Sequence, residues 1–195
     1  MKHASRLLAS AVAAFSTATL ATGALAASVT LPLDPGHSQV LLRGYAFGLT
    51  PNNGQFKDYS GTLTLDPPNI DTCTVDMTLQ AKSLAMSMGM VTKMVLAEDF
   101  LDPAKYPTLA FHGACKSNGP DKLPTLVGTL TMHGETHPFS MDVTYKDSVL
   151  TTSGKLKREE WNVNGSQTVI GDTVKVTVVV RLPDSIKFNY TPSSD

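Results

Sequence analysis

Alternating apolar and polar residues between Leu126 and Tyr145 predict a β-hairpin. Even-numbered positions are apolar or glycine as far as Met132, and odd-numbered positions are apolar from Phe139 onward. Pairing Met132 with Phe139 places the apolar residues of both strands on one face. Because a lone hairpin is only marginally stable in water, the rest of the chain must supply strands that cover this face.

Similar alternation predicts six more strands, near 37–47, 56–65, 73–81, 109–115, 149–158 and 174–182. Short clusters rich in Pro, Gly and Asn separate these segments, and no internal repeat or linker interrupts them. Eight antiparallel strands with one apolar face each can close on themselves and so remove their exposed edges. The predicted fold is therefore all-β, an eight-stranded antiparallel barrel.

The segment 83–96 is the one helical insert that the sequence favours, between the third and fourth predicted strands. Met86, Met90 and Met94 recur every four residues, so a helix would stack them on one side. This stripe either packs onto the barrel as ordinary core or forms an adaptable wall for an apolar guest, a use that suits flexible, polarizable methionines.

An interior cavity is expected because Gly113, Gly128 and Gly154 fall on the apolar faces of their strands. Glycine there marks either a bend or missing side-chain volume, and an eight-stranded barrel has room for one small ligand at most. Leucine at Gly128 or Gly154 is then expected to fill the cavity without unfolding the protein. The parity of the strands predicts the remaining lining: Val75, Met77, Leu79, Phe111, Leu130, Met132, Phe139, Met141, Val143, Leu156, Val176 and Val178.

The first 26 residues have the pattern of a secretory signal peptide. Lys2 and Arg6 precede an acid-free run rich in Ala and Leu that ends in Ala-Leu-Ala at 24–26, and its Ser and Thr content argues against a membrane anchor. Residues 27–195 are expected to form a single domain. Their 14 basic and 17 acidic residues give a formal charge of about −3, which does not favour nucleic acid or an anionic membrane surface.

The two cysteines are predicted to form a disulfide. If the third and fourth strands are adjacent and antiparallel, pairing Leu79 with Leu109 puts Cys73 directly opposite Cys115. Opposed residues lie about 4.5 to 5.5 Å apart at Cα, a distance that a disulfide accepts. The alternative is a pair of buried free thiols that pack as small hydrophobic groups.

Residues able to do acid–base or metal chemistry are few: Asp34, His37, His112, His133, His137, Glu159 and Glu160. Asp34 and His37 flank a Pro-Gly turn, where a local hydrogen bond is the common use. The neighbouring glutamates point to opposite faces of a strand, and the spacing of the histidines matches no closed zinc site. No catalytic residue, metal or cofactor is therefore expected.

Arg158 shares its parity with Leu156, so a regular seventh strand would turn its side chain toward the interior. A buried arginine is costly without a partner. The guanidinium either pairs with Glu160 or a backbone carbonyl, or it donates hydrogen bonds to a ligand carbonyl or phosphate.

Short segments that recur in order between residues 31 and 183 point to a known family. They are 33–38 (LDPGHS), 54–56 (GQF), 59–63 (YSGTL), 82–84 (KSL), 99–102 (DFLD), 105–107 (KYP), 128–138 (GTLTMHGETHP), 157–163 (KREEWNV) and 171–174 (GDTV). In these segments the chain resembles the YceI family of lipocalin-like periplasmic proteins associated with polyisoprenoid binding. Two departures are the Met-rich stretch 86–94, where members often carry charged residues, and the absence of a histidine around 45–47.

The resemblance implies an extended lipocalin-like barrel with a long apolar pocket for an isoprenoid tail, such as that of a quinone. We therefore expect a periplasmic, non-catalytic carrier, monomeric or homodimeric, without nucleic acid and without stable membrane insertion. Two alternatives remain open. One is a carrier for another amphiphile, such as a fatty acid, a fatty amide or a hydrophobic drug, and the other is an enzyme that modifies such a lipid.

Overall fold

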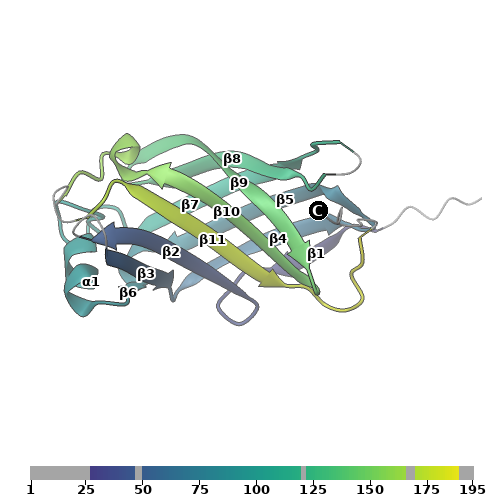
Figure 1. The fold of residues 1–195 in the computed structure, drawn as a ribbon, viewed down its shortest axis with the longest axis horizontal. Helices are drawn as coiled ribbons and strands as arrows, with labels where there is room; N and C mark the ends of the chain where they lie inside the picture. The colour runs from purple at the N-terminus through teal and green to yellow at the C-terminus, as the bar shows by residue number, and fades with distance from the viewer. Residues whose placement is uncertain (1–26, 47–49, 120–121, 166–169, 189–195) are drawn as a thin grey trace, which may run out of the picture.

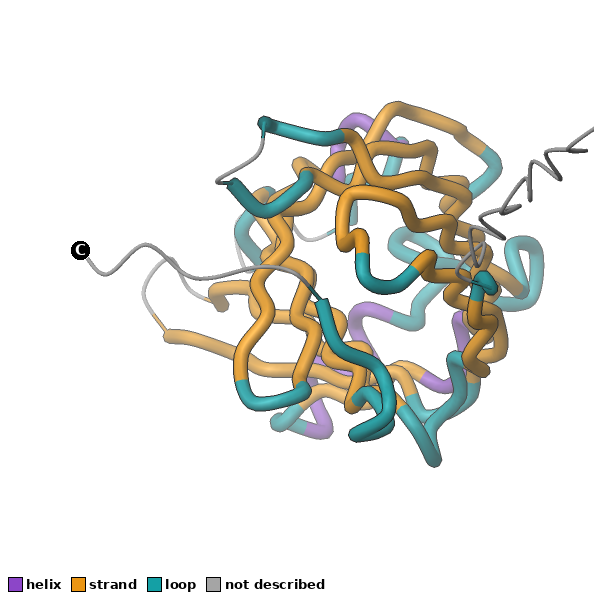
Figure 2. Tube along the Cα trace, turned by 90° about the vertical axis from the view of Figure 1, so that its right-hand side faces the viewer, coloured by secondary structure: helices purple, strands orange, loops and turns teal. Residues whose placement is uncertain are grey.

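Antiparallel strands curl around a common interior (Figures 1 and 2), which a cluster of buried apolar side chains occupies. The computed structural model describes residues 27–46, 50–119, 122–165 and 170–188, so the expected leader at 1–26 lies outside the described residues. Within these ranges, every helix is too short or too polar to cross a membrane.

All strands belong to one sheet, in the order β1-β4-β5-β7-β8-β9-β10-β11-β2-β3-β6, and every pairing is antiparallel. The strands are β1 (Val29–Pro32), β2 (Ser38–Ala46), β3 (Thr50–Phe56), β4 (Tyr59–Asp66), β5 (Asn69–Gln80), β6 (Leu84–Met86), β7 (Thr108–Lys116), β8 (Thr125–Met132), β9 (Glu135–Lys146), β10 (Val149–Lys157) and β11 (Thr173–Arg181). The helical elements are η1 (Ala81–Ser83), α1 (Gly89–Val95) and η2 (Arg158–Trp161).

The expected count of eight strands is wrong, because the described residues form a sheet of 11 strands. The alternation does not predict β1, β3 or β6, which are short or rich in Pro, Asn and Gly. β3 pairs with β2 and β6, and it continues through Lys57 and Asp58 into β4, which pairs with β1 and β5. This continuity joins the two ends of the strand order, so the curled sheet surrounds the core.

The hairpin of β8 and β9 has a tighter turn than the sequence pattern predicts. Met132 lies opposite Glu135 rather than Phe139, and the turn consists of His133 and Gly134, with φ of 53° and 81°. Two residues with positive φ match the right-handed twist of paired strands. The register therefore shifts by four residues, an even number, and the predicted apolar faces are retained. β9 continues through Pro138, which lacks the N–H that usually pairs in a strand interior.

The predicted disulfide is confirmed: Cys73 on β5 is bonded to Cys115, and their Cα atoms lie 4.9 Å apart. The register that suggested it is also present, because Leu79 pairs with Leu109 and Val75 with Gly113. The bond ties β5 to β7 near the end of their ladder. The segment between the two cysteines, which the bond closes into a loop, contains α1.

The interpretation of Gly113, Gly128 and Gly154 as missing cavity volume is wrong. A Cβ at each position would come within 3.0 Å of a carbonyl oxygen on the neighbouring strand, and none of the three lines the cavity described below. These glycines mark places where strands approach closely and bend.

Replacement of Gly128 by Leu is accordingly expected to destabilise the fold, by about 1 to 3 kcal/mol, because the side chain would overlap the backbone of β7 at His112. Chemical denaturation measures the effect. Thr129→Leu is the matched control, since Thr129 is the exposed neighbour on the same strand. Equal stability of the two variants would contradict the close-approach interpretation.

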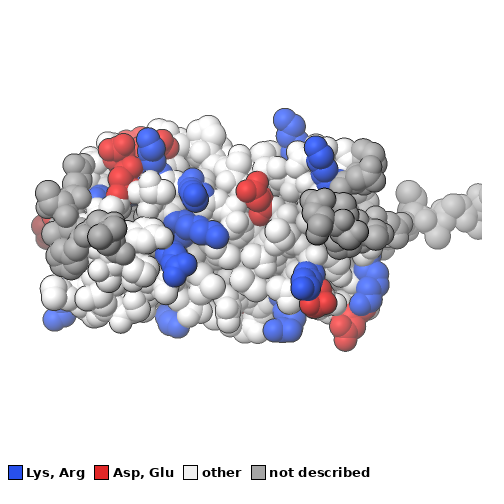
Figure 3. All heavy atoms as spheres, viewed as in Figure 1, with Lys and Arg blue, Asp and Glu red and all other residues white. Residues whose placement is uncertain are grey.

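The outer face of the sheet carries scattered charge, with basic side chains gathered over β10, β11 and β2 (Figure 3). Lys155 pairs with Lys175, which in turn pairs with Arg43, and all three side chains are exposed. Like charges on adjacent strands repel one another weakly in water. This face is therefore solvated, and the apolar side chains between these positions in sequence turn inward.

Candidate ligand cavity

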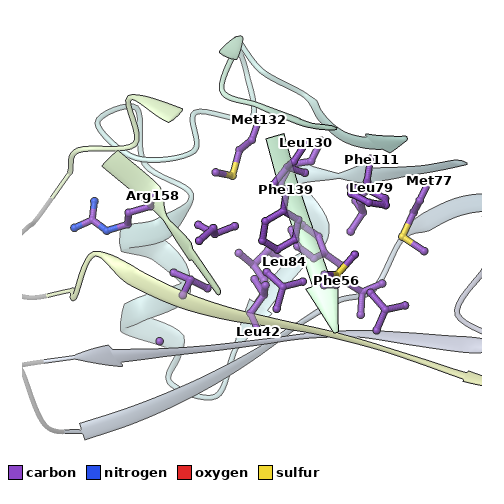
Figure 4. Close-up of a pocket in the computed structure, with 18 of the residues that line it drawn as sticks. Leu42, Phe56, Met77, Leu79, Leu84, Phe111, Leu130, Met132, Phe139 and Arg158 are labelled. Atoms are coloured by element: carbon purple, nitrogen blue, oxygen red, sulfur yellow. The ribbon is translucent and has the colours of Figure 1, made fainter. Parts of the chain in front are cut away.

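The interior of the curled sheet contains a cavity of about 160 Å³, lined almost entirely by apolar side chains (Figure 4). Every described strand except β1 contributes residues to the lining, and so does α1. The polar side chains among them belong to Tyr45, Asn52, Thr152 and Arg158. Empty space of this kind inside a core is energetically unfavourable unless a guest fills it, so the cavity is the candidate ligand site.

Most of the residues predicted from strand parity, together with Met86 of the methionine stripe, line the cavity. These are Val75, Met77, Leu79, Met86, Phe111, Leu130, Met132, Phe139, Met141, Leu156, Arg158, Val176 and Val178. Met90, Met94 and Val143 do not belong to the lining. Val143 is buried on β9, but it packs in the core away from the open space.

The Met-rich segment is organised differently from the predicted 83–96 helix. Met86 lies on β6, opposite Gly54, and only Gly89–Val95 is α-helical in this segment. The helix turns Val91 and Val95 into the interior, whereas Met90 is 65% exposed. The two valines are also four residues apart, so the sequence offers a valine stripe and a methionine stripe, and either could face the interior. β-Branched valines pack at the cavity wall and the methionine stripe is broken.

Arg158 lies where β10 gives way to η2, and its side chain is buried at one end of the cavity (Figure 4). Its guanidinium donates hydrogen bonds to the carbonyl oxygens of Val163, Ile170 at 2.7 Å and Gly171 at 3.2 Å. Phe100 covers it, with the ring centroid 4.7 Å from Cζ. These contacts support the structural alternative, in which backbone carbonyls are the partners, rather than pairing with Glu160.

The charge of Arg158 is not neutralised by a close carboxylate in the described part of the chain. Burial lowers the pKa of its guanidinium from the usual value, while the charges of Asp172 and Glu159 act in the opposite direction. Arginine nevertheless remains protonated in proteins. Arg158 therefore places a positive charge beside one end of the cavity, with its guanidinium turned away from the other lining side chains (Figure 4).

Asn52 and Thr152 add two neutral polar groups to the wall. The Thr152 hydroxyl points to the sulfur of Met141 at 3.6 Å, a weak contact. Asn52 accepts a hydrogen bond from the Ser87 hydroxyl at 3.3 Å. The sequence pattern did not predict Asn52 as a lining residue, because 51–54 has the composition of a turn; its alternation with Gly54 and Phe56 was the available signal.

The histidines singled out from the sequence lie apart from the cavity lining. His37 contacts Asp34 at 2.8 Å across the predicted turn, and His112 contacts Asp76 at 2.6 Å on the outer face. The pKa of Asp34 is lowered, mainly by its hydrogen bond with His37. His133 contacts the carbonyl oxygen of Trp161 at 3.2 Å. Across the described ranges, no three His, Cys, Asp or Glu side chains are grouped to hold a metal ion.

Comparison with known proteins gives consistent matches. The family model of the YceI-like domain matches residues 31–182. A UPF0312 protein of Pseudomonas savastanoi pv. phaseolicola is 33% identical over 137 residues, which cover 69% of this chain and 71% of that protein. The crystal structure of BcnA from Burkholderia cenocepacia is similar with a TM-score of 0.61 and 24% identity, over 73% of this chain and 94% of that one.

A polyisoprenoid binding domain from Saccharophagus degradans has the same fold at 12% identity, with a TM-score of 0.51 over 75% of this chain and 94% of that domain. A curled antiparallel sheet around an apolar interior places the protein in the lipocalin-like class of folds. Within that class, the chain belongs to the YceI-like domain family.

Proposed function

We propose that the protein is a periplasmic, non-catalytic carrier that holds a long apolar lipid of the isoprenoid type in its cavity. The observation that carries this proposal is the apolar lining, which continues from Met77 at one end to Arg158 at the other (Figure 4). Enclosing a hydrocarbon chain there stabilises the complex by about 25 cal/mol per Å² of apolar surface removed from water. The polyisoprenoid binding domain of similar fold supports the choice of ligand class.

Secretion and the carrier role rest on further features. The predicted leader at 1–26 and the disulfide both suit an oxidising compartment outside the cytoplasm. A binding role, rather than an enzymatic one, is supported by the match to the YceI-like domain and by the polyisoprenoid binding domain of similar fold. In this proposal the protein takes up one lipid, shields it from water and releases it unchanged, as a monomer or homodimer.

Native mass spectrometry of the gently purified mature protein is expected to show one additional mass per chain, equal to a prenyl lipid, that disappears after denaturation. A guest mass that matches a fatty acid or fatty amide would instead favour a carrier for another amphiphile. A protein that stays without a guest, and that does not bind an added prenylated quinone, would contradict the proposal.

Narrowing the cavity is expected to weaken lipid binding. Val176→Phe places a ring into the lined space from β11, so the affinity for a prenylated quinone should fall about 10-fold or more. Thr177→Phe is the matched control, because the neighbouring side chain points to the opposite face of the strand. Fluorescence displacement titration measures both. Equal affinities in the two folded variants would show that the lipid lies elsewhere.

A further inference from the structure

Asn52 is a polar side chain held inside an apolar wall. Asn52 lies on β3, on the same face of the strand as Gly54 and Phe56. The residue is only 2% exposed. The residue lies in the cavity wall. An asparagine in this position is unfavourable unless both ends of its amide have hydrogen-bond partners.

Only one end of that amide is satisfied. Oδ1 accepts from the hydroxyl of Ser87, whereas Nδ2 has no hydrogen-bond partner among the described residues. A buried donor without an acceptor costs about 1 to 3 kcal/mol, so a purely structural role would leave a net penalty at this position. A ligand in the cavity that accepts a hydrogen bond from Nδ2 would remove this penalty.

Space for such a group exists directly beside Asn52. Gly44 on β2 lies opposite Asn52 in the register, is buried, and also lines the cavity. A Cβ built on Gly44 would meet no atom within 4 Å. Because paired residues face the same side of a sheet, this open space adjoins the Asn52 side chain.

The same end of the cavity contains Arg158. Ala46, two residues beyond Gly44 on β2, forms a bridge with Ile170, whose carbonyl oxygen accepts a hydrogen bond from Arg158. The guanidinium is already held by three carbonyl oxygens, which fix it as part of the wall. Asn52 is thus the side-chain donor at this end whose N–H groups are without an acceptor in the described chain.

We propose that Asn52 binds the polar end of the lipid by donating a hydrogen bond from Nδ2 to an oxygen acceptor, such as a carbonyl or ether oxygen. The proposal rests on the proposed function and adds two features to it. The ligand must carry an oxygen acceptor at one terminus. That terminus lies beside Gly44 and Asn52, while the hydrocarbon tail extends toward Met77.

The test compares two probes with the same prenyl tail, a prenylated benzoquinone and a prenyl hydrocarbon without oxygen. The wild-type protein is expected to prefer the quinone, and Asn52→Leu to lose about 5- to 10-fold in quinone affinity while hydrocarbon affinity is unchanged or higher. The melting temperature of ligand-free Asn52→Leu should equal or exceed that of wild type, since the unpartnered donor is removed. Gly44→Val keeps Asn52 but occupies the adjoining space, and it should lower quinone affinity as well.

The outcomes separate this inference from the function on which it rests. Equal losses for both probes in Asn52→Leu, or an unchanged quinone preference, would overturn the role of Asn52 while leaving a lipid carrier in place. Failure of the wild-type protein to bind either probe would overturn both. If Asn52→Leu does not fold, an unaltered quinone preference in Gly44→Val is the result that rejects the proposal.

Discussion

Removing the disulfide by the double substitution Cys73→Ala and Cys115→Ala is expected to lower the free energy of unfolding by about 4 kcal/mol. The two cysteines are 42 residues apart, and a closed loop of that length restricts the unfolded chain by this amount on the chain-entropy model. For a domain of this size, the melting temperature should fall by roughly 8 to 16 °C. Denaturant titration of the mature protein measures the change.

The control is the wild-type protein with and without a reductant, which should reproduce the same loss without any substitution. The double variant itself should be insensitive to reductant. Two thiols that react with an alkylating reagent in unreduced, denatured wild-type protein would contradict the presence of the bond. A double variant as stable as wild type would show that packing alone restrains the segment between the two cysteines, which contains α1.

Arg158→Ala is expected to cost about 3 to 5 kcal/mol, because it leaves the buried carbonyl oxygens of Val163, Ile170 and Gly171 without their donor. It also removes the cation that stacks on Phe100. The loss should be measurable by denaturant titration of ligand-free protein. The segment that contains Val163 and the segment that contains Ile170 and Gly171 should then show faster amide hydrogen exchange, because the guanidinium no longer joins them.

Arg158→Lys is the matched control for charge. A lysine keeps the cation but cannot present the planar fork that satisfies three carbonyl oxygens at once, so it should recover only a minor part of the lost stability. Full recovery would show that charge, rather than geometry, is what the site requires. A folded Arg158→Ala variant with wild-type stability and greatly weakened lipid binding would assign the residue to the ligand instead.

Alternation along the chain was sufficient to predict the eight longest stretches of strand and their inward faces. Cys73 and Cys115 were paired correctly because strand parity leaves few registers in which two thiols are opposed. The hairpin turn was wrong, since 133–138 has the composition of a longer turn and Pro138 normally discourages strand pairing. Its even-numbered shift preserved the predicted faces, which explains why most of the predicted residues on these two strands still line the cavity.

The parts that sequence did not predict depend on tertiary contacts. β3 contains Pro, Asn and Gly and carries no apolar stripe, so its strand conformation comes from the neighbours β2 and β6. Asn52, on that strand, was therefore missed. Likewise, the choice between the methionine and valine stripes of the 83–96 segment depends on which face meets the core, and periodicity alone favours neither.

The short strands at the two ends of the strand order also affect how this protein behaves at high concentration. Hydrogen bonding around the sheet leaves free outer edges at β1 and β6, which span only Val29–Pro32 and Leu84–Met86. Short edges give another chain little backbone to pair with, and Pro32 lacks an amide donor. The two ends of the strand order therefore offer little surface for edge-to-edge aggregation.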